Sequence, residues 1–151
     1  ALEADTAALT EAAEEVEEDY DEFNPLDNLP IEAQKFIKDM KQKYEAKGMS
    51  VWTTSLGEKT YAWRPLLWPE YKEIQRSLIK LFPATADSAE EMELKQADRR
   101  FANMEQVITR CVIYPEINLE SIGFIGSGAM HTLYDNIAEQ SGFGPEYVEK
   151  V

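Results

Sequence analysis

The chain has 151 residues, 44% of them hydrophobic, which suits one domain with a real core. Its net charge of −14 argues against electrostatic binding to DNA, RNA or anionic lipid, because clustered Lys and Arg bind phosphates. The lone Cys111 excludes an internal disulfide framework and a cysteine metal cluster, and it favours a reducing compartment. We expect no transmembrane helix and no secretory leader. Because the sequence starts at Ala1 rather than Met, we expect a processed or incomplete N terminus.

The negative charge is concentrated at the N-terminal end. Residues 1–29 hold 11 acidic residues and no Lys or Arg, whereas residues 30–151 hold 18 acidic and 15 basic residues. Two prolines and two asparagines in FNPLDNLP, residues 23–30, break any helix there. The sequence therefore predicts an acidic arm over 1–29 and a nearly balanced body over 30–151.

The acidic arm also carries apolar residues. A 4-3-4 spacing places four of them on one stripe of a helix: Leu9, Ala13, Val16 and Tyr20. One interpretation is a solvated acidic tail; the other is an arm, extended or partly helical, that lays this stripe on a partner and folds as it binds. In the second interpretation the arm's partner-binding residues are Leu9, Val16, Tyr20, Phe23 and Leu26, with Leu29 as a further anchor.

The first half of the body predicts a helix followed by a hairpin. Residues 29–48 carry a helical apolar stripe and end at Gly48. Residues 50–64 are rich in Val, Trp, Thr and Tyr around a turn at Gly57, which indicates strands over about 50–55 and 59–64. Trp52 and Thr54 share one face of the first strand.

Three further helices are expected after the hairpin. Apolar spacing predicts helices over about 69–82, 88–112 and 127–141, with a connector over 114–123 that contains at most a short helical turn. On the longest helix the expected core stripe is Leu94, Ala97, Phe101, Met104, Ile108 and Cys111. Asp87 or Ser88 would cap that helix, and Gly142 would end the last one. The predicted fold class is mainly α with one small β-hairpin: a compact helical domain plus the acidic arm.

GFIGSGAMH, residues 123–131, is the stretch that most resembles a catalytic loop. A phosphate loop needs a Lys after its last Gly, a dinucleotide fingerprint needs a different glycine order, and a nucleophile elbow needs Gly two positions before Ser127. All three patterns fail here. We therefore interpret Ser127 as the cap of the last helix and the glycines as a turn into it.

Other candidate sites are equally weak. Cys111 and His131 could meet in space as a nucleophilic pair, but Cys111 falls on an apolar stripe, which is typical of a packing thiol. The acidic residues at 90–93 lack the Glu-x-x-His pattern of a carboxylate metal site. We expect no catalytic residue, no metal and no cofactor. Arg76, Arg99 and Arg100, with Arg110, form a modest basic set that could pair with the acidic arm, within one chain or between copies.

The aromatic residues of the hairpin are a more informative cluster. Three Trp residues fall within 17 positions, and exposed Trp, Tyr and Arg commonly anchor protein interfaces. A hairpin with aromatic residues on both strands can pack one face on the helices and present the other. The candidate partner-binding residues here are Trp52, Tyr61, Trp63, Arg64 and Trp68.

The stretch YAWRPLLWPEYKEIQ, residues 61–75, resembles small tail and baseplate-hub assembly proteins of contractile-tailed bacteriophages. An aromatic strand leads through Arg64, Pro65 and Leu66 into a helix that opens with Glu70 and Tyr71. VITRCVIYPEIN (107–118) and LYDNIAEQSGF (133–143) are similar to later parts of such chains, so the resemblance covers about 50–143. Residues 1–29 have no counterpart in that pattern.

The resemblance implies a virion component or an assembly chaperone rather than an enzyme. Its partners would be other phage tail or baseplate proteins in a multi-subunit assembly, with no direct nucleic acid and no membrane, in the virion or the host cytoplasm. Two alternatives remain open: an acidic regulator that mimics nucleic acid and binds a basic protein, and a small enzyme that uses His131.

Overall fold

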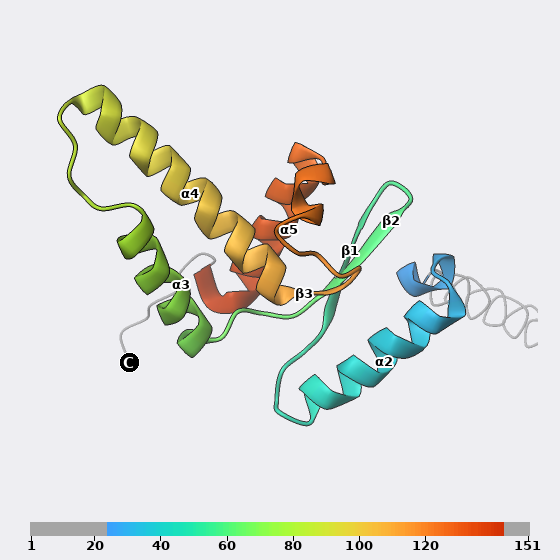
Figure 1. Ribbon diagram of the computed structural model, residues 1–151. Helices are drawn as coiled ribbons and strands as arrows, with labels where there is room; N and C mark the ends of the chain where they lie inside the picture. The colour runs from blue at the N-terminus through green and yellow to red at the C-terminus, as the bar shows by residue number, and fades with distance from the viewer. Residues whose placement is uncertain (1–23, 144–151) are drawn as a thin grey trace, which may run out of the picture.

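The computed structural model describes residues 24–143, shown as the coloured ribbon in Figure 1. The predictions for Leu9, Val16, Tyr20 and Phe23 of the acidic arm lie outside the described residues. The elements in chain order are η1 (Pro25–Asn28), α2 (Ile31–Glu45), β1 (Trp52–Leu56), β2 (Lys59–Trp63), α3 (Trp68–Leu81), α4 (Ala89–Cys111), β3 (Val112–Tyr114), η2 (Ser121–Phe124), α5 (Ser127–Ala138) and η3 (Glu139–Phe143).

The mainly helical class with a small hairpin is confirmed, and the described residues add one strand to it. Residues 112–114, expected at the end of a helix and in a connector, form β3, which pairs antiparallel with β2 in the order β1-β2-β3. The strand follows α4 directly and has only three residues. Alternation cannot be recognised over so short a run, and its pairing depends on a strand 50 residues earlier.

The hairpin register determines which side chains share a face. Trp52 lies opposite Trp63, and Thr54 lies opposite Tyr61. These four residues therefore point to one face of the sheet, while Thr53, Ser55, Thr60 and Ala62 point to the other. The Trp52 and Trp63 rings stack with centroids 6.2 Å apart, so Trp52 covers its cross-strand neighbour.

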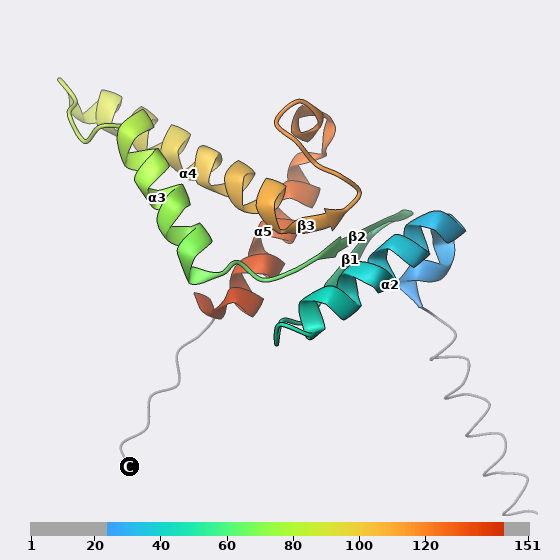
Figure 2. The ribbon, with the colours of Figure 1, turned by 60° about the horizontal axis from the view of Figure 1, so that its bottom comes forward.

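The sheet lies between α2 and the helices α3, α4 and α5 (Figures 1 and 2). Ala33 and Ile37 are the buried residues of α2. The main core lies on the other side, where α3, α4 and α5 meet the sheet, and its fully buried side chains are Ile74, Leu78, Ile108, Cys111, Leu133 and Ile137. Because both faces of β2 are covered, four consecutive residues of that strand are buried, Thr60 to Trp63.

The expected core stripe of α4 is only half correct. Ile108 and Cys111 are buried and Met104 packs on the core, but Leu94 and Phe101 are exposed. The 23 residues of α4 extend beyond the helices that pack on it, so its N-terminal half projects from the body (Figure 1). Helical spacing identifies a stripe but not how much of the stripe is covered.

The helix ends follow the expected capping chemistry with one exception. Ser88 caps α4 by accepting the Glu91 N–H at 3.1 Å. Gly142, with φ of 95°, ends the helical region after α5. Ser127 is not a cap: Gly126 occupies that position without a side-chain hydrogen bond, and Ser127 is the first helical residue. A glycine at the N-cap costs little, because Gly is among the residues preferred at that position.

A buried hydroxyl joins the hairpin to α5. Thr54 Oγ1 accepts hydrogen bonds from Trp63 Nε1 at 2.8 Å and from Asn136 Nδ2 at 2.9 Å. Both donors depend on this one acceptor for the bonds that orient them, since Trp63 is almost fully buried.

We expect Thr54→Val to lower the free energy of unfolding by about 2–3 kcal/mol, because it removes the acceptor while leaving two donors at the site. The matched change Thr54→Ser keeps the hydroxyl and loses one methyl group, at a cost of about 1 kcal/mol. Urea unfolding of both variants measures the difference. Equal losses for Val and Ser would show that the hydroxyl contributes nothing beyond packing.

Candidate functional site

The junction between the hairpin and α3 is organised by Arg64. Its Nη1 and Nη2 donate to the two carboxylate oxygens of Glu70, each at 2.7 Å, in a bidentate pair. The Arg64 N–H also donates to the Cys111 carbonyl at 3.0 Å, and Nη2 donates to the Arg110 carbonyl at 3.2 Å. The guanidinium lies 5.5 Å from the ring centroid of Tyr44 on α2. One side chain thus contacts α2, α3 and the end of α4.

Burial and charge act in opposite directions on this ion pair. Burial raises the pKa of the Glu70 carboxyl most strongly, but the hydrogen bonds and charge of Arg64, with the Leu67 N–H, outweigh it and the net pKa is lowered. The hydrogen bond to Glu70 raises the pKa of Arg64. The side chains of Arg64 and Glu70 are only 11% and 21% exposed, so this ion pair is largely buried and contributes to the fold.

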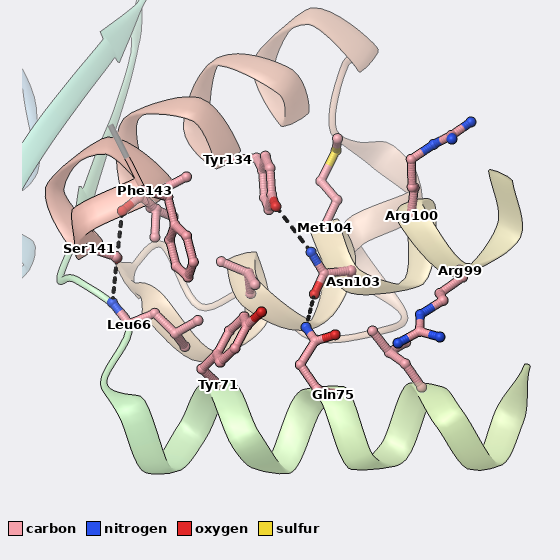
Figure 3. Close-up of a pocket in the computed structure, with 14 residues that line it drawn as sticks. Leu66, Tyr71, Gln75, Arg99, Arg100, Asn103, Met104, Tyr134, Ser141 and Phe143 are labelled. Atoms are coloured by element: carbon pink, nitrogen blue, oxygen red, sulfur yellow. Dashed lines mark hydrogen bonds between the residues drawn. The ribbon is translucent and has the colours of Figure 1, made fainter. Parts of the chain in front are cut away.

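A pocket of about 450 Å³ opens between α3, α4, α5 and η3 (Figure 3). Its size falls in the range of sites that receive a small ligand or an anchoring side chain. The apolar side chains that line it are Leu66, Leu78, Met104, Val107, Ile137 and Phe143. The exposed surface of the lining is mostly apolar, with polar and charged side chains set into it, which is typical of a binding site.

A chain of hydrogen bonds crosses the pocket. Gln75 Nε2 on α3 donates to Asn103 Oδ1 on α4 at 3.0 Å, and Asn103 Nδ2 donates to Tyr134 OH on α5 at 3.0 Å. At the other end Ser141 Oγ accepts the Leu66 N–H at 2.8 Å. These bonds fix the three helices relative to one another at the lining (Figure 3).

The two ends of the pocket differ in chemistry. Arg99 and Arg100 line one end, on α4, while Phe143 lies at the other (Figure 3). Phe143 packs against Tyr71 with ring centroids 5.3 Å apart, and Tyr71 stacks on Trp68 at 5.6 Å. Trp68 is 65% exposed. We call the pocket with this row of three aromatic residues the α3–α4 groove.

The structure separates the candidate partner-binding residues of the hairpin. Trp68 lies at the surface beside the groove and Trp52 is 41% exposed. Tyr61 and Trp63 are only 4% and 2% exposed, so they pack in the core, on the face of the sheet that meets α3, α4 and α5.

The two remaining candidate partner-binding residues within the described chain also have structural roles. Arg64 is held by Glu70, as described above. Leu26 lies half-buried in η1, whose Pro25 carbonyl accepts a 3.3 Å hydrogen bond from Thr60 Oγ1 on β2. The chain thus packs on the hairpin from Pro25 onward, within the range assigned to the acidic arm.

Sequence reasoning missed most of the groove. Gln75, Asn103 and Tyr134 stand on three different helices, and only their packing brings them together. The available signal was an amide at the edge of each apolar stripe: Gln75 follows Ile74, and Asn103 precedes Met104. Arg99 and Arg100 were noted as basic residues, but nothing in the sequence indicated the pocket beside them.

Cys111 and His131 occupy different environments. Cys111 is fully buried, and burial raises the pKa of its thiol to about 12. His131 is exposed on α5. Among residues 24–143, no group of three or more His, Cys, Asp and Glu side chains could hold a metal ion. No helix in the same range is long and apolar enough to cross a membrane.

Comparisons with protein-family models, with curated proteins and with solved structures found no match to this chain.

We expect the Arg64–Glu70 pair to stabilise the fold by an amount that depends on pH. Because folding lowers the Glu70 pKa below its usual 4.5, the stabilisation is present above that pH and is lost as the pH falls through the lower folded value. Glu70→Gln should lower the free energy of unfolding by about 1.5–3 kcal/mol at pH 7. Its difference from the unaltered protein should shrink in acid.

A matched control lies one turn away on α3. Glu73 pairs with Arg110 at 2.6 Å, but its side chain is 65% exposed, so Glu73→Gln should cost at most about 1 kcal/mol. Denaturant unfolding between neutral and acidic pH compares the two variants. If Glu70→Gln and Glu73→Gln lower the free energy of unfolding by the same amount, burial of the Arg64–Glu70 pair has no energetic consequence.

We also expect the Cys111 thiol of the folded protein to resist a disulfide-exchange reagent at pH 8, because the thiolate that reacts is nearly absent and buried. The thiol should react promptly once guanidinium unfolds the chain. His131→Cys combined with Cys111→Ala places a thiol at an exposed position and should react quickly in the folded state. A Cys111 rate equal to that of this variant would contradict the buried assignment.

Proposed function

We propose that the chain is a non-enzymatic assembly protein of a contractile-tailed phage tail or baseplate that acts through protein–protein contacts. The observation that carries this proposal is the α3–α4 groove, with an apolar pocket beside the exposed Trp68. Trp and Tyr next to a desolvated pocket are the usual anchors of protein interfaces.

Exposed apolar side chains on the same two helices support a binding surface. Ile79 on α3 and Leu94 and Phe101 on α4 are each more than half exposed. Single exposed apolar residues need no explanation, but large ones gathered on the helices that form a pocket favour contact with another protein.

The segment that resembles phage assembly proteins forms one structural unit. Residues 61–75 contain the end of β2, the Arg64–Glu70 pair and the start of α3. The unit sets the position of Trp68 and Tyr71 on the groove. This agrees with a structural role for Arg64 and Glu70 and a contact role for the aromatic residues after them.

The alternative, an acidic regulator that mimics nucleic acid, depends on residues 1–29 alone. Over the described residues 24–143 the chain has 17 acidic and 14 basic residues, so that part presents no dense array of negative charge. A mimic would lose its partner steeply with added salt, whereas a contact made by the apolar groove would not.

The proposal is tested by co-expressing the chain with the products of the neighbouring genes and measuring the mass of purified complexes. We expect a complex with a tail or baseplate protein. Trp68→Ala should weaken it at least about 30-fold, the effect of losing an interface anchor worth about 2 kcal/mol. Phe36→Ala serves as the control, because Phe36 is an exposed aromatic residue on α2, across the sheet from the groove.

Two results would contradict the proposal. One is the absence of any complex with tail or baseplate proteins. The other is a complex with a basic DNA-binding protein that survives Trp68→Ala and dissociates in salt, which would favour the regulator.

A further inference from the structure

The chemistry of the α3–α4 groove restricts what can occupy it. Apolar side chains line the pocket, and Arg99 and Arg100 stand at one end (Figure 3). An occupant needs apolar side chains for the pocket and carboxylates for the arginines. Within residues 24–143, Arg64 and Arg110 are held in ion pairs, whereas neither Arg99 nor Arg100 is. The two guanidinium groups are therefore available to a ligand.

The chain carries a segment with this complementary chemistry. Residues 1–23 contain ten acidic residues and no Lys or Arg. Helical spacing places Leu9, Ala13, Val16 and Tyr20 on one stripe, with carboxylates on the positions around it. An amphipathic helix of this kind binds by laying its apolar face in a groove.

The other end of the chain fits the groove less well. Residues 144–151 follow Phe143 directly, but they hold two Glu and one Lys, and their large apolar residues are Tyr147, Val148 and Val151. Their charge of −1 offers little to a pair of arginines, compared with −10 for residues 1–23. Charge complementarity therefore favours the N-terminal segment.

The position of the groove indicates which copy supplies the segment. The described chain begins at Asn24 beside α2, on the opposite side of the body from the pocket between α3 and α5, and both views agree (Figures 1 and 2). We propose that residues 1–23 of one copy dock in the α3–α4 groove of a neighbouring copy, linking copies head to tail. The inference rests on the proposed function in that it takes the groove as a protein-binding site.

Head-to-tail docking has consequences for assembly. The two surfaces of the contact differ, so each copy offers one free groove and one free segment, and association continues into rings or open chains. The contact pairs carboxylates with two arginines at an exposed rim, so salt should weaken it. The docked segment would cover the same groove that binds other tail proteins, and self-association would compete with that binding.

The test measures the mass of the full-length protein by analytical ultracentrifugation over a range of concentrations at low salt. We expect the mass to rise with concentration beyond a dimer. Arg99→Glu with Arg100→Glu should shift this association to at least about 10-fold higher concentration. Lys35→Glu with Lys38→Glu changes the net charge equally on the exposed surface of α2 and should leave it unchanged. Circular dichroism confirms that each variant remains folded.

A complementation experiment identifies the segment and the copy. Val16→Ser with Tyr20→Ser should likewise shift association of the pure variant to at least about 10-fold higher concentration. Mixing this variant with the Arg99→Glu, Arg100→Glu variant should restore a dimer and nothing larger, because only one intact segment and one intact groove remain. Tyr147→Ser with Val148→Ser should have no effect.

Several outcomes would overturn the inference: a mass that stays monomeric at every concentration, equal effects of the Arg and Lys pairs, no dimer in the mixture, or loss of association in the Tyr147, Val148 variant. These results are separable from the proposed function. A monomeric chain whose tail partner is still lost in Trp68→Ala would reject self-docking and retain the assembly role. Self-association without any tail partner would retain self-docking and reject the assembly role.

Discussion

The Arg64 guanidinium is the contact on which the arrangement of this fold depends. The guanidinium pairs with the Glu70 carboxylate in the first turn of α3, and its Nη2 donates to a carbonyl in the last turn of α4. It also lies over the ring of Tyr44 on α2. A planar group with donors in fixed directions specifies angles as well as distances, which a lysine could not do. Its Nε has no hydrogen-bond partner among residues 24–143, a cost that the bidentate pair must outweigh. The direction in which α3 leaves the hairpin is thereby set.

The groove follows from that direction. Because α3 starts at the Arg64 junction and α4 ends there, the two helices pack through Ile74, Leu78, Val107 and Ile108 near the sheet. Farther from the sheet, the pocket is bridged by polar side chains rather than filled by apolar ones. Gln75 donates a hydrogen bond to Asn103 at this place. Larger apolar side chains at these two positions would fill the pocket. The amides hold the helices together, so the same residues make a structural bond and line the pocket.

The sequence predicted what local periodicity controls and missed what packing controls. Each α-helix of the described chain was expected within a few residues, because apolar spacing and caps such as Ser88 are local. The burial of Tyr61 and Trp63 was not expected, because alternation does not say which face of a hairpin the helices cover, and α3, α4 and α5 cover the face that carries these two side chains. The exposure of Phe101 and the joining of Gln75, Asn103 and Tyr134 depend on where helices end relative to their neighbours. No single-element pattern contains that information.

Charge and exposed apolar side chains are both unevenly distributed in this chain. The same physical argument applies to both. Arg99 and Arg100 form no ion pair among the described residues, although acidic side chains stand on the same helix. At the same time ten carboxylates are collected in residues 1–23 with no cation among them. Concentrating like charges raises the repulsion within a segment, and exposing Trp68 and Phe101 leaves apolar area in water. The repulsion among the carboxylates falls when they meet a basic surface, and the exposed apolar area falls when it packs on another apolar surface. The proposed assembly role accounts for both features, because the free energy would be recovered on binding a partner and not in the isolated fold.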